Sequence, residues 1–174
     1  MKRYAAALMI LVSFAFSAPS LAATFYVTPT GGGSGTAPGS PTTLQAALTP
    51  ATNNSESDTI RVAQGAYVGN FYHYPASGEN FDLILEGGWS EDFNDRTIDN
   101  TNTILDGNHA GRVLTISKST ASASGNVTIE GFTIRNGFVA GSGAGVYIRS
   151  YPPGTVTLSR NIIGNNECTD TGGG

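Results

Sequence analysis

Acidic side chains gather in one stretch of the sequence, SEDFNDRTIDN, which runs from Ser90 to Asn100. Asp92, Asp95 and Asp99 are candidate Ca²⁺ ligands in this stretch, because Ca²⁺ takes six to eight oxygen ligands and carboxylates supply many of them. Their spacing matches neither an EF-hand loop nor the nonapeptide repeat of calcium-binding β-rolls. A solvated turn between two strands explains the same residues, so we expect a turn and keep Ca²⁺ as the alternative.

Aromatic side chains form a second candidate site. Tyr72 and Tyr74 belong to the stretch NFYHYP, and Trp89 belongs to GGWSEDF. Flat rings on an exposed face can stack against sugar rings, while polar neighbours fix the orientation of the ligand. The same rings can instead pack a loop onto the body of the protein, and we favour packing. These three residues are nevertheless the candidates for stacking against a glycan.

No arrangement of catalytic groups is evident. A lyase that abstracts a proton beside a carboxylate needs a base and a cation held together, and Arg112, Glu130 and Arg135 are available. Nothing in their spacing makes them converge, so pairing or solubility explains them. His73 and His109 are far apart in the sequence, and neither has a second ligand nearby. We therefore assign no catalytic residue, no metal site and no cofactor besides the Ca²⁺ alternative.

The composition excludes several classes of protein. Of the 174 residues, 39% are hydrophobic and only 13% are charged, whereas coiled coils and helical bundles need many Lys, Glu and Arg. Val, Ile, Leu and Phe recur in short organised runs, which argues against a disordered chain. The formal net charge of −4 leaves no basic surface to neutralise a phosphate backbone. We therefore expect no nucleic-acid partner.

Residues 1–22 have the features of a signal peptide. Lys2 and Arg3 form a basic start, an apolar run follows from residue 5 to residue 16, and small residues precede Ala23. The apolar run is shorter than the roughly 20 residues that a membrane-spanning helix needs. We expect cleavage after Ala22, a mature chain without a membrane span, and a secreted or cell-surface location.

The mature chain shows one helical signal followed by many short strands. Ser40 can cap a helix that ends near Leu48, and Leu44 and Ala47 share its apolar face with Leu48. From Asp58 onward, short alternating runs are separated by Gly, Asn, Asp and Ser, which is typical of strands joined by turns. No helical segment lies between the strands, so doubly wound and α/β-barrel folds are excluded.

The strands repeat at an offset of about 29 residues. The aligned pairs are Val127 with Val156, Thr128 with Thr157, Ile129 with Leu158, Ile134 with Ile163 and Asn136 with Asn165. A longer offset aligns Leu114 with Val146 and Ile116 with Ile148. One turn of chain cannot bury its own apolar side chains, whereas stacked turns form parallel strands about 4.8 Å apart around an aliphatic interior. The repeat therefore predicts a solenoid of roughly five or six coils.

Three details of this solenoid follow. The predicted helix is placed to cover the first open edge of the stack. Asn136 and Asn165 would stack their side-chain amides at a turn. Asn161 falls under the apolar Phe132, so we expect its side chain to point outward or to form hydrogen bonds inside.

Several segments resemble a known family, the exported right-handed parallel β-helix proteins. The mature start, TFYVTPTGG, is similar to the N-terminal cap of that family, and so are LQAAL, DTIRVAQGAYVGNF, LEGGWSEDF, NTILDGN and VTIEGFTIRNG. The later GAGVYI, GTVTLSRNIIGNN and GGG resemble coils of polymorphic outer-membrane and surface-anchored repeats. The resemblance covers roughly residues 24–174. It implies an all-β, right-handed parallel β-helix with a short N-terminal capping helix.

The expected organisation has three parts. Residues 1–22 are the signal peptide, residues 23–57 are an N-terminal cap with a short strand and the helix, and residues 58–174 are β-helix coils. Members of the family usually continue for many more coils, and the glycine run 172–174 resembles the opening of another. We therefore expect a truncated solenoid whose uncapped last coil can associate, and a partner for Cys168 beyond residue 174.

The resemblance implies two functions. The first is an exported bacterial surface protein that acts as an elongated, non-catalytic scaffold or adhesin-like binder toward glycans or cell surfaces. The second is a polysaccharide lyase or glycoside hydrolase, since the family includes pectate-lyase-like enzymes, with its active site on coils beyond residue 174. Acidic and basic groups do not converge in this sequence, which favours the first function.

Overall fold

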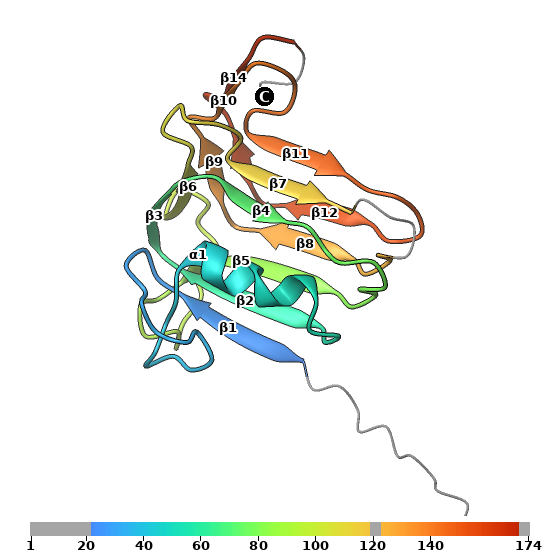
Figure 1. The fold of residues 1–174 in the computed structure, drawn as a ribbon. Coiled ribbons are helices and arrows are strands. Elements are labelled where there is room, and N and C mark those ends of the chain that lie inside the picture. The colour runs from blue at the N-terminus through green and yellow to red at the C-terminus, as the bar shows by residue number, and fades with distance from the viewer. Residues whose placement is uncertain (1–21, 119–122, 171–174) are drawn as a thin grey trace, which may run out of the picture.

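The computed structural model describes residues 22–118 and 123–170 (Figure 1). Residues 1–21 of the predicted signal peptide, which spans residues 1–22, lie outside the described residues, and so does the glycine run 172–174. Within them, the chain is mostly β, its sheets are parallel, and it has one short α-helix.

The elements begin with a strand and the helix, and strands follow to the end. Their bounds are β1 (Ala23–Val27), α1 (Leu44–Leu48), the 3-10 turn η1 (Pro50–Thr52), β2 (Asp58–Ala63), β3 (Gly65–Val68), β4 (Phe71–His73), β5 (Leu83–Trp89), β6 (Thr103–Asp106), β7 (Leu114–Ser117), β8 (Val127–Glu130), β9 (Thr133–Arg135), β10 (Phe138–Val139), β11 (Val146–Arg149), β12 (Val156–Ser159), β13 (Ile162–Ile163) and β14 (Glu167–Cys168).

These strands form four sheets. Sheet A has the order β1-β2-β5-β8-β12, sheet B has β13-β9-β6-β3, sheet C has β11-β7-β4, and sheet D pairs β10 with β14. The chain visits these sheets in a repeated order, and we call each such circuit a pass. Each pass adds a strand to sheet A, then one to sheet B, and then one to sheet C or D. The passes therefore lie above one another, as Figure 1 shows for β2, β5 and β8.

The described residues make four passes, which begin at β2, β5, β8 and β12, rather than the five or six that we expected. Polar residues just before the strands of sheet A mark the length of each pass. From Ser57 to Asp82 the spacing is 25 residues, from Asp82 to Asn126 it is 44, and from Asn126 to Thr155 it is 29. The second pass is the longest because it carries the acidic stretch between β5 and β6.

The alignments predicted from the repeat are confirmed by the strand register. Val156 of β12 lies opposite Val127 of β8, and Val146 of β11 lies opposite Leu114 of β7. Both pairs are parallel and in register, so each inward side chain of one pass lies directly on its counterpart in the next.

Rows of aliphatic side chains fill the interior. One row crosses sheet A through Phe25, Ile60, Leu85 and Ile129, none of which is more than 8% exposed. Burying a side chain of this size contributes about 1.5–3 kcal/mol relative to leaving it in water. The passes are therefore held together chiefly by these rows, with the parallel backbone ladders setting their spacing.

Two segments close the first end of the stack. Residues 35–42 lie along the free edge of β1, where the Tyr26 amide donates to the Gly35 carbonyl at 2.8 Å and the Thr42 amide donates to the Tyr26 carbonyl at 2.9 Å. Gly31 precedes this segment, and a Cβ atom there would collide with the Thr42 carbonyl. Only glycine allows the loop to approach its own backbone so closely.

The helix seals the edge of sheet C, although it begins later than we predicted. Thr43, rather than Ser40, is its N-cap, and the Thr43 side chain accepts a hydrogen bond from the Ala46 amide at 3.4 Å. Residues 40–42 are held extended by their pairing with β1, so they cannot start the helix. The apolar face of α1 is buried, and Gln45 reaches the edge strand β4.

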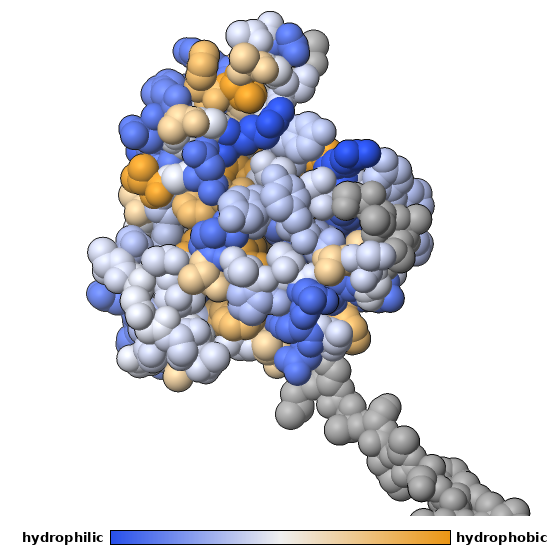
Figure 2. Space-filling view, in the orientation of Figure 1, coloured by the Kyte–Doolittle hydropathy of each residue, from blue (hydrophilic) through white to orange (hydrophobic). Residues whose placement is uncertain are grey.

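The opposite end of the stack is uncovered within the described residues. β11, β12 and β13 are the last strands of their sheets. Leu158 and Ile148 are 37% and 40% exposed, whereas Ile129 and Ile116, their partners one pass earlier, are fully buried. In Figure 2 apolar side chains gather in the upper part of the view, where β9, β10 and β14 lie in Figure 1.

Candidate functional site

Tyrosines line the outer face of sheet C. Along β4 the side chains of Phe71 and His73 are buried and that of Tyr72 is exposed, because alternate residues of a strand face opposite sides. In register, Tyr72 lies beside Thr115 of β7, and Thr115 lies beside Tyr147 of β11. Tyr72 and Tyr147 are therefore two strand spacings apart, or about 10 Å.

Tyr72 and Tyr74 form an exposed stacked pair. Their ring centroids are 5.2 Å apart, their planes differ by 23°, and the residues are 46% and 52% exposed. The side-chain amide of Gln45 fixes the Tyr72 backbone: its Nε2 donates to the Tyr72 carbonyl at 3.1 Å, and its Oε1 accepts from the Tyr72 amide at 2.9 Å. Two flat rings on a firmly held strand are what stacking against a sugar requires.

Two arginines extend this surface. The Arg112 guanidinium lies 4.6 Å from the centroid of the Tyr147 ring, and its Nε donates to the Ser142 carbonyl at 3.1 Å. The Arg149 guanidinium lies 5.5 Å from the Tyr151 ring and donates to the Tyr151 hydroxyl at 2.8 Å. That hydrogen bond raises the pKa of Arg149. We call Tyr72, Tyr74, Thr115, Ser117, Tyr147, Arg149 and Tyr151 the tyrosine face.

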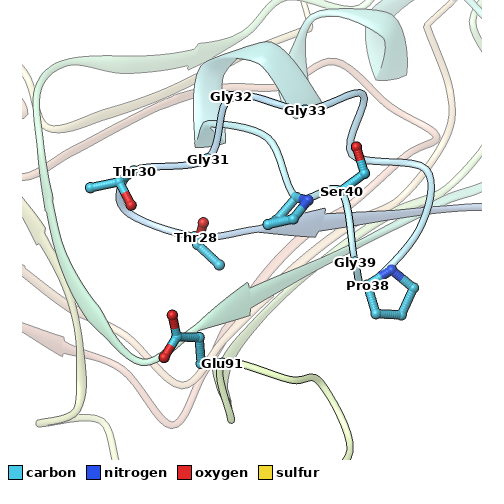
Figure 3. Close-up of a pocket in the computed structure, with 10 residues that line it drawn as sticks. Thr28, Thr30, Gly31, Gly32, Gly33, Pro38, Gly39, Ser40 and Glu91 are labelled. Carbon is cyan, nitrogen blue, oxygen red and sulfur yellow. The ribbon is translucent and has the colours of Figure 1, made fainter.

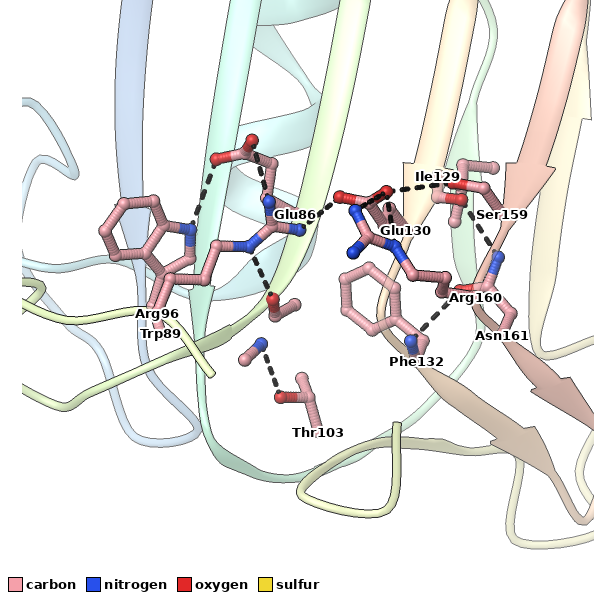
Figure 4. A network of polar contacts seen from close by, with 12 residues as sticks. Glu86, Trp89, Arg96, Thr103, Ile129, Glu130, Phe132, Ser159, Arg160 and Asn161 are labelled. Carbon is pink, nitrogen blue, oxygen red and sulfur yellow. Dashed lines mark hydrogen bonds and ion pairs between the residues drawn. The ribbon is translucent and has the colours of Figure 1, made fainter. Parts of the chain in front are cut away.

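Trp89, the third predicted stacking residue, lies on a different sheet. It ends β5 in sheet A, whereas Tyr72 lies on β4 in sheet C. The Arg61 guanidinium covers its ring at 4.3 Å, and the indole Nε1 donates to Glu86 at 3.2 Å. Figure 4 shows the hydrogen bond from the Trp89 indole to Glu86. The structure thus brings Tyr72 and Tyr74 together and leaves Trp89 apart from them.

A ladder of alternating charges crosses the outer face of sheet A (Figure 4). Arg96 bridges Glu86 at 3.2 Å and Glu130 at 2.8 Å, and Arg160 pairs with the other Glu130 oxygen. Burial opposes ionisation of Glu130, but hydrogen bonds from Arg160, Arg96 and Ser159 outweigh it and hold the pKa of Glu130 below its usual value. The charges satisfy one another, so this ladder serves to bind successive passes together.

The groups considered for lyase chemistry are dispersed among separate contacts. Glu130 belongs to the sheet A ladder, and Arg135 pairs with Asp106 of the preceding pass at 3.0 Å. Arg112 lies over Tyr147 near sheet C. The structure therefore does not bring a base, a cation and a carboxylate to one point among these residues.

Two of the three candidate Ca²⁺ ligands, Asp92 and Asp99, accept hydrogen bonds from nearby residues of the same connection. Asp92 accepts from the Ser90 hydroxyl at 2.6 Å and from the Asn94 side chain at 2.8 Å, and these bonds lower the pKa of Asp92. Asp99 accepts from the Thr101 hydroxyl at 2.6 Å, which lowers the pKa of Asp99 in the same way. For Asp95, the backbone amide donates to the Ser90 hydroxyl. Across residues 22–118 and 123–170 no group of three metal-ligating side chains forms.

A polar cavity of about 490 Å³ lies at the closed end of the stack (Figure 3). The glycine-rich loop after β1 curves around it, and Glu91 reaches it from the connection after β5. The Thr28 and Thr30 hydroxyls also line it. No pattern in the sequence predicts this cavity, because it exists only where the loop folds back beside a segment some fifty residues later in the chain. It offers hydroxyl groups and one carboxylate but no nucleophile with an adjacent base.

His73 is a polar exception within the core. It is 3% exposed, and burial lowers its pKa to about 4, against the opposing effect of a hydrogen bond with the Leu48 backbone. Its Nδ1 has no hydrogen-bond partner within the described residues. His109 lies instead at an exposed turn, with φ of 53°. One histidine is therefore buried in the core, and the other lies at an exposed turn.

Sequence reasoning missed Tyr147, Arg149 and Tyr151. The signal was present, since the repeat alignment that pairs Leu114 with Val146 also places Tyr147 on the outward row beside Thr115. The repeat alignment did not include the pairing of β4 with β7, because the spacing from β4 to β7 differs from that of the other repeats. Without that pairing, Tyr72 and Tyr147 could not be placed on one surface.

Comparison with known proteins gives no relative. No protein-family model matches the sequence, and no curated protein or solved structure is significantly similar to it. As to membranes, the part of the chain that the structure describes has no helix with the length and apolar character needed to cross one. The site must therefore be interpreted from its own geometry.

Proposed function

We propose that the chain is a right-handed parallel β-helix whose first end is closed by residues 23–57. Support comes from the parallel sheets, from the repeated order in which passes feed sheets A, B and C, and from the in-register rows of like residues. Such a stack is rigid and elongates by adding passes, which suits a scaffold that carries binding surfaces on its outer faces.

We also propose that the protein is exported and acts at the cell surface or outside the cell. The support is the signal-peptide pattern of residues 1–22. N-terminal sequencing of the protein recovered outside the cytoplasm tests this directly. We expect the mature chain to begin at Ala23. Recovery of only the full-length chain from the cytoplasm would contradict the proposal.

The function that the geometry supports best is binding of glycans by the tyrosine face. One observation carries it: Tyr72 and Tyr74 are stacked, exposed, and lie on the same outer face as Tyr147. Sheet A, by comparison, covers its outer face with ion pairs that satisfy one another. Tyr72 and Tyr74 stack on each other and are still about half exposed, so their rings are open to a ligand, and sugar rings match them in shape and polarity.

Affinity electrophoresis in gels that contain a polysaccharide tests this function. We expect the mature chain to be retarded, and the double variant Tyr72→Ala/Tyr74→Ala to lose most of the retardation. Phe138→Ala is the matched control, because Phe138 is a 44% exposed aromatic residue on sheet D. Equal mobility of the parent and the double variant in every polysaccharide would overturn the proposal.

A further inference from the structure

The arginines of the described residues fall into two groups. Arg96, Arg135 and Arg160 each form an ion pair with a carboxylate. Arg61, Arg112 and Arg149 form no such pair within residues 22–118 and 123–170, and each lies over an aromatic ring instead. Two of these last three, Arg112 and Arg149, lie at or beside the tyrosine face.

Among the described residues, no carboxylate forms an ion pair with Arg149. The groups that raise its pKa are Tyr151 and Tyr147, and no carboxylate is among them. Along sheet C the outward positions in register are Tyr72, Thr115 and Tyr147 in one row, and Ser117 and Arg149 in the next. Neither row contains an acidic residue. A protein with a formal net charge of −4 thus keeps a positive, aromatic surface on one face.

Stacked arginines are suited to binding anions. A guanidinium is planar, presents five N–H donors, and pairs with carboxylate or sulfate oxygens through two parallel hydrogen bonds. The Tyr151 hydroxyl takes one donor of Arg149 and holds the group in place, while the other donors stay available. The Tyr147 ring orients Arg112 in the same way.

We propose that the tyrosine face selects anionic saccharides, with Arg149 and Arg112 binding a carboxylate or sulfate group while Tyr72 and Tyr74 stack against the sugar rings. This inference rests on the glycan-binding function proposed above and names the class of ligand. Arg149 is the main determinant of specificity, because it is exposed and belongs to the outward rows of sheet C. Arg112, stacked on the Tyr147 ring, is the second anion-binding residue.

Three polymers with one backbone test the proposal. Dextran is neutral, carboxymethyl dextran carries carboxylates, and dextran sulfate carries sulfates, so only the anionic group differs among them. We expect the mature chain to bind at least one charged dextran about tenfold or more tightly than dextran. The charged polymer that binds more tightly identifies the anionic group. Equal binding of all three polymers would overturn the proposal.

Arginine variants show where the preference arises. Arg149→Gln is expected to weaken binding of the charged dextran about five- to tenfold, and Arg149→Lys to recover part of it, because a point charge lacks the planar fork. Arg160→Gln is the matched control: it removes one positive charge from sheet A, where the Arg160 side chain is 60% exposed. Equal losses in Arg149→Gln and Arg160→Gln would mean attraction by net charge alone and would overturn the proposal.

Two further outcomes separate this inference from the function on which it rests. If Tyr72→Ala/Tyr74→Ala binds charged dextran as the parent does, while Arg149→Gln does not, the anion preference stands and stacking by the tyrosines is wrong. If polyglutamate competes as well as charged dextran at equal charge, the surface recognises anions without regard to sugar, and selection of a saccharide is overturned.

Discussion

At the scale of single residues, asparagine side chains join one pass to the next. The Asn161 amide donates to the Ile129 carbonyl at 2.9 Å, and its oxygen accepts from the Phe132 amide at 3.0 Å. In the same way, the Asn166 side chain donates to the Ile134 carbonyl and accepts from the Gly137 amide. The chain turns at these points, so strand pairing does not supply hydrogen-bond partners for these backbone N–H and C=O groups. The asparagine side chains supply the partners instead.

Asn161→Ala tests this role. The substitution leaves a backbone carbonyl and a backbone amide without their partners, so we expect the free energy of unfolding to fall by about 1–3 kcal/mol. Urea unfolding followed by circular dichroism measures it. Thr157→Ala is the control, because Thr157 is exposed on the same pass and a change there should stay within about 0.5 kcal/mol. Equal effects of the two changes would show that the bridge contributes nothing.

Asp58 and His73 give the stability of the fold opposite responses to pH. Burial raises the pKa of Asp58 to about 6, although the hydrogen bond from Asn54 opposes the rise, and Glu79 and Glu56 add to it. Between pH 4 and pH 6 the folded protein therefore holds more of this proton than the unfolded chain, and the contribution of Asp58 to stability falls as the pH rises. The lowered pKa of His73 makes its contribution rise with pH up to about 6.5.

Asp58→Asn separates the two responses. We expect the variant to gain about 2–3 kcal/mol relative to the parent between pH 4 and pH 7, because the falling contribution is removed and that of His73 remains. Urea unfolding at several pH values across this range provides the measurement. Glu91→Gln, in an exposed connection, controls for the loss of one negative charge. A difference between Asp58→Asn and the parent that does not vary with pH would refute the assignment.

At the scale of elements, the helix α1 is a cover rather than a structural core. It spans only Leu44–Leu48, too short to be stable by itself in water. Its buried face closes the aliphatic interior, and Gln45 satisfies the edge of β4. Together with residues 35–42, it prevents other strands from pairing at this end.

Gln45→Ala is expected to expose that edge. Two hydrogen bonds to Tyr72 are lost, so the free energy of unfolding should fall by about 1–2 kcal/mol, and the amides of β4 should exchange their hydrogens faster. Hydrogen exchange with mass spectrometry measures the second effect locally. Ala46→Ser changes the neighbouring exposed helix position and should leave β4 unaffected. Unchanged exchange in β4 after Gln45→Ala would show that the amide does not protect the strand.

At the scale of the whole molecule, the two ends of the stack are unlike. Within residues 22–118 and 123–170, the first end has covered edges, and the other presents Leu158, Ile148 and the last strands of sheets A, B and C. We propose that the chain associates through this uncovered end, since apolar rows and unpaired strand edges both favour contact.

Sedimentation over a range of protein concentrations tests this association. We expect the mature chain to form larger species as its concentration rises, and Leu158→Lys to raise the dissociation constant at least about tenfold, because a charge in an apolar contact must be desolvated. Val68→Lys is the control, since Val68 is 66% exposed on β3 in sheet B, away from the open end. A parent chain that stays monomeric, or equal effects of both lysines, would exclude association through this end.

Much of the architecture could be predicted from the sequence because it depends on local pattern. Alternation of apolar and polar residues placed the strands, and the offset between Val127 and Val156 gave their register, which the pairing of β8 with β12 confirms. Tyr72 and Tyr74 were candidates from residue type alone, and the exposure of Tyr72 follows from alternation along β4. The amides of Asn136 and Asn165 were expected to stack, but Asn136 donates to Asp106 instead, because a carboxylate is the stronger acceptor.

The tertiary structure alone decided which residues share a surface. Connections of unequal length between strands shift the repeat, so the sequence could not show that Tyr72 lies in register with Tyr147, that Trp89 is covered by Arg61, or that Glu130 and Arg135 belong to different ion pairs. Whether a segment forms a strand depends on its neighbours along the chain, and the sequence contains that information. A binding face depends on which passes lie side by side, and loop lengths and long-range packing determine that.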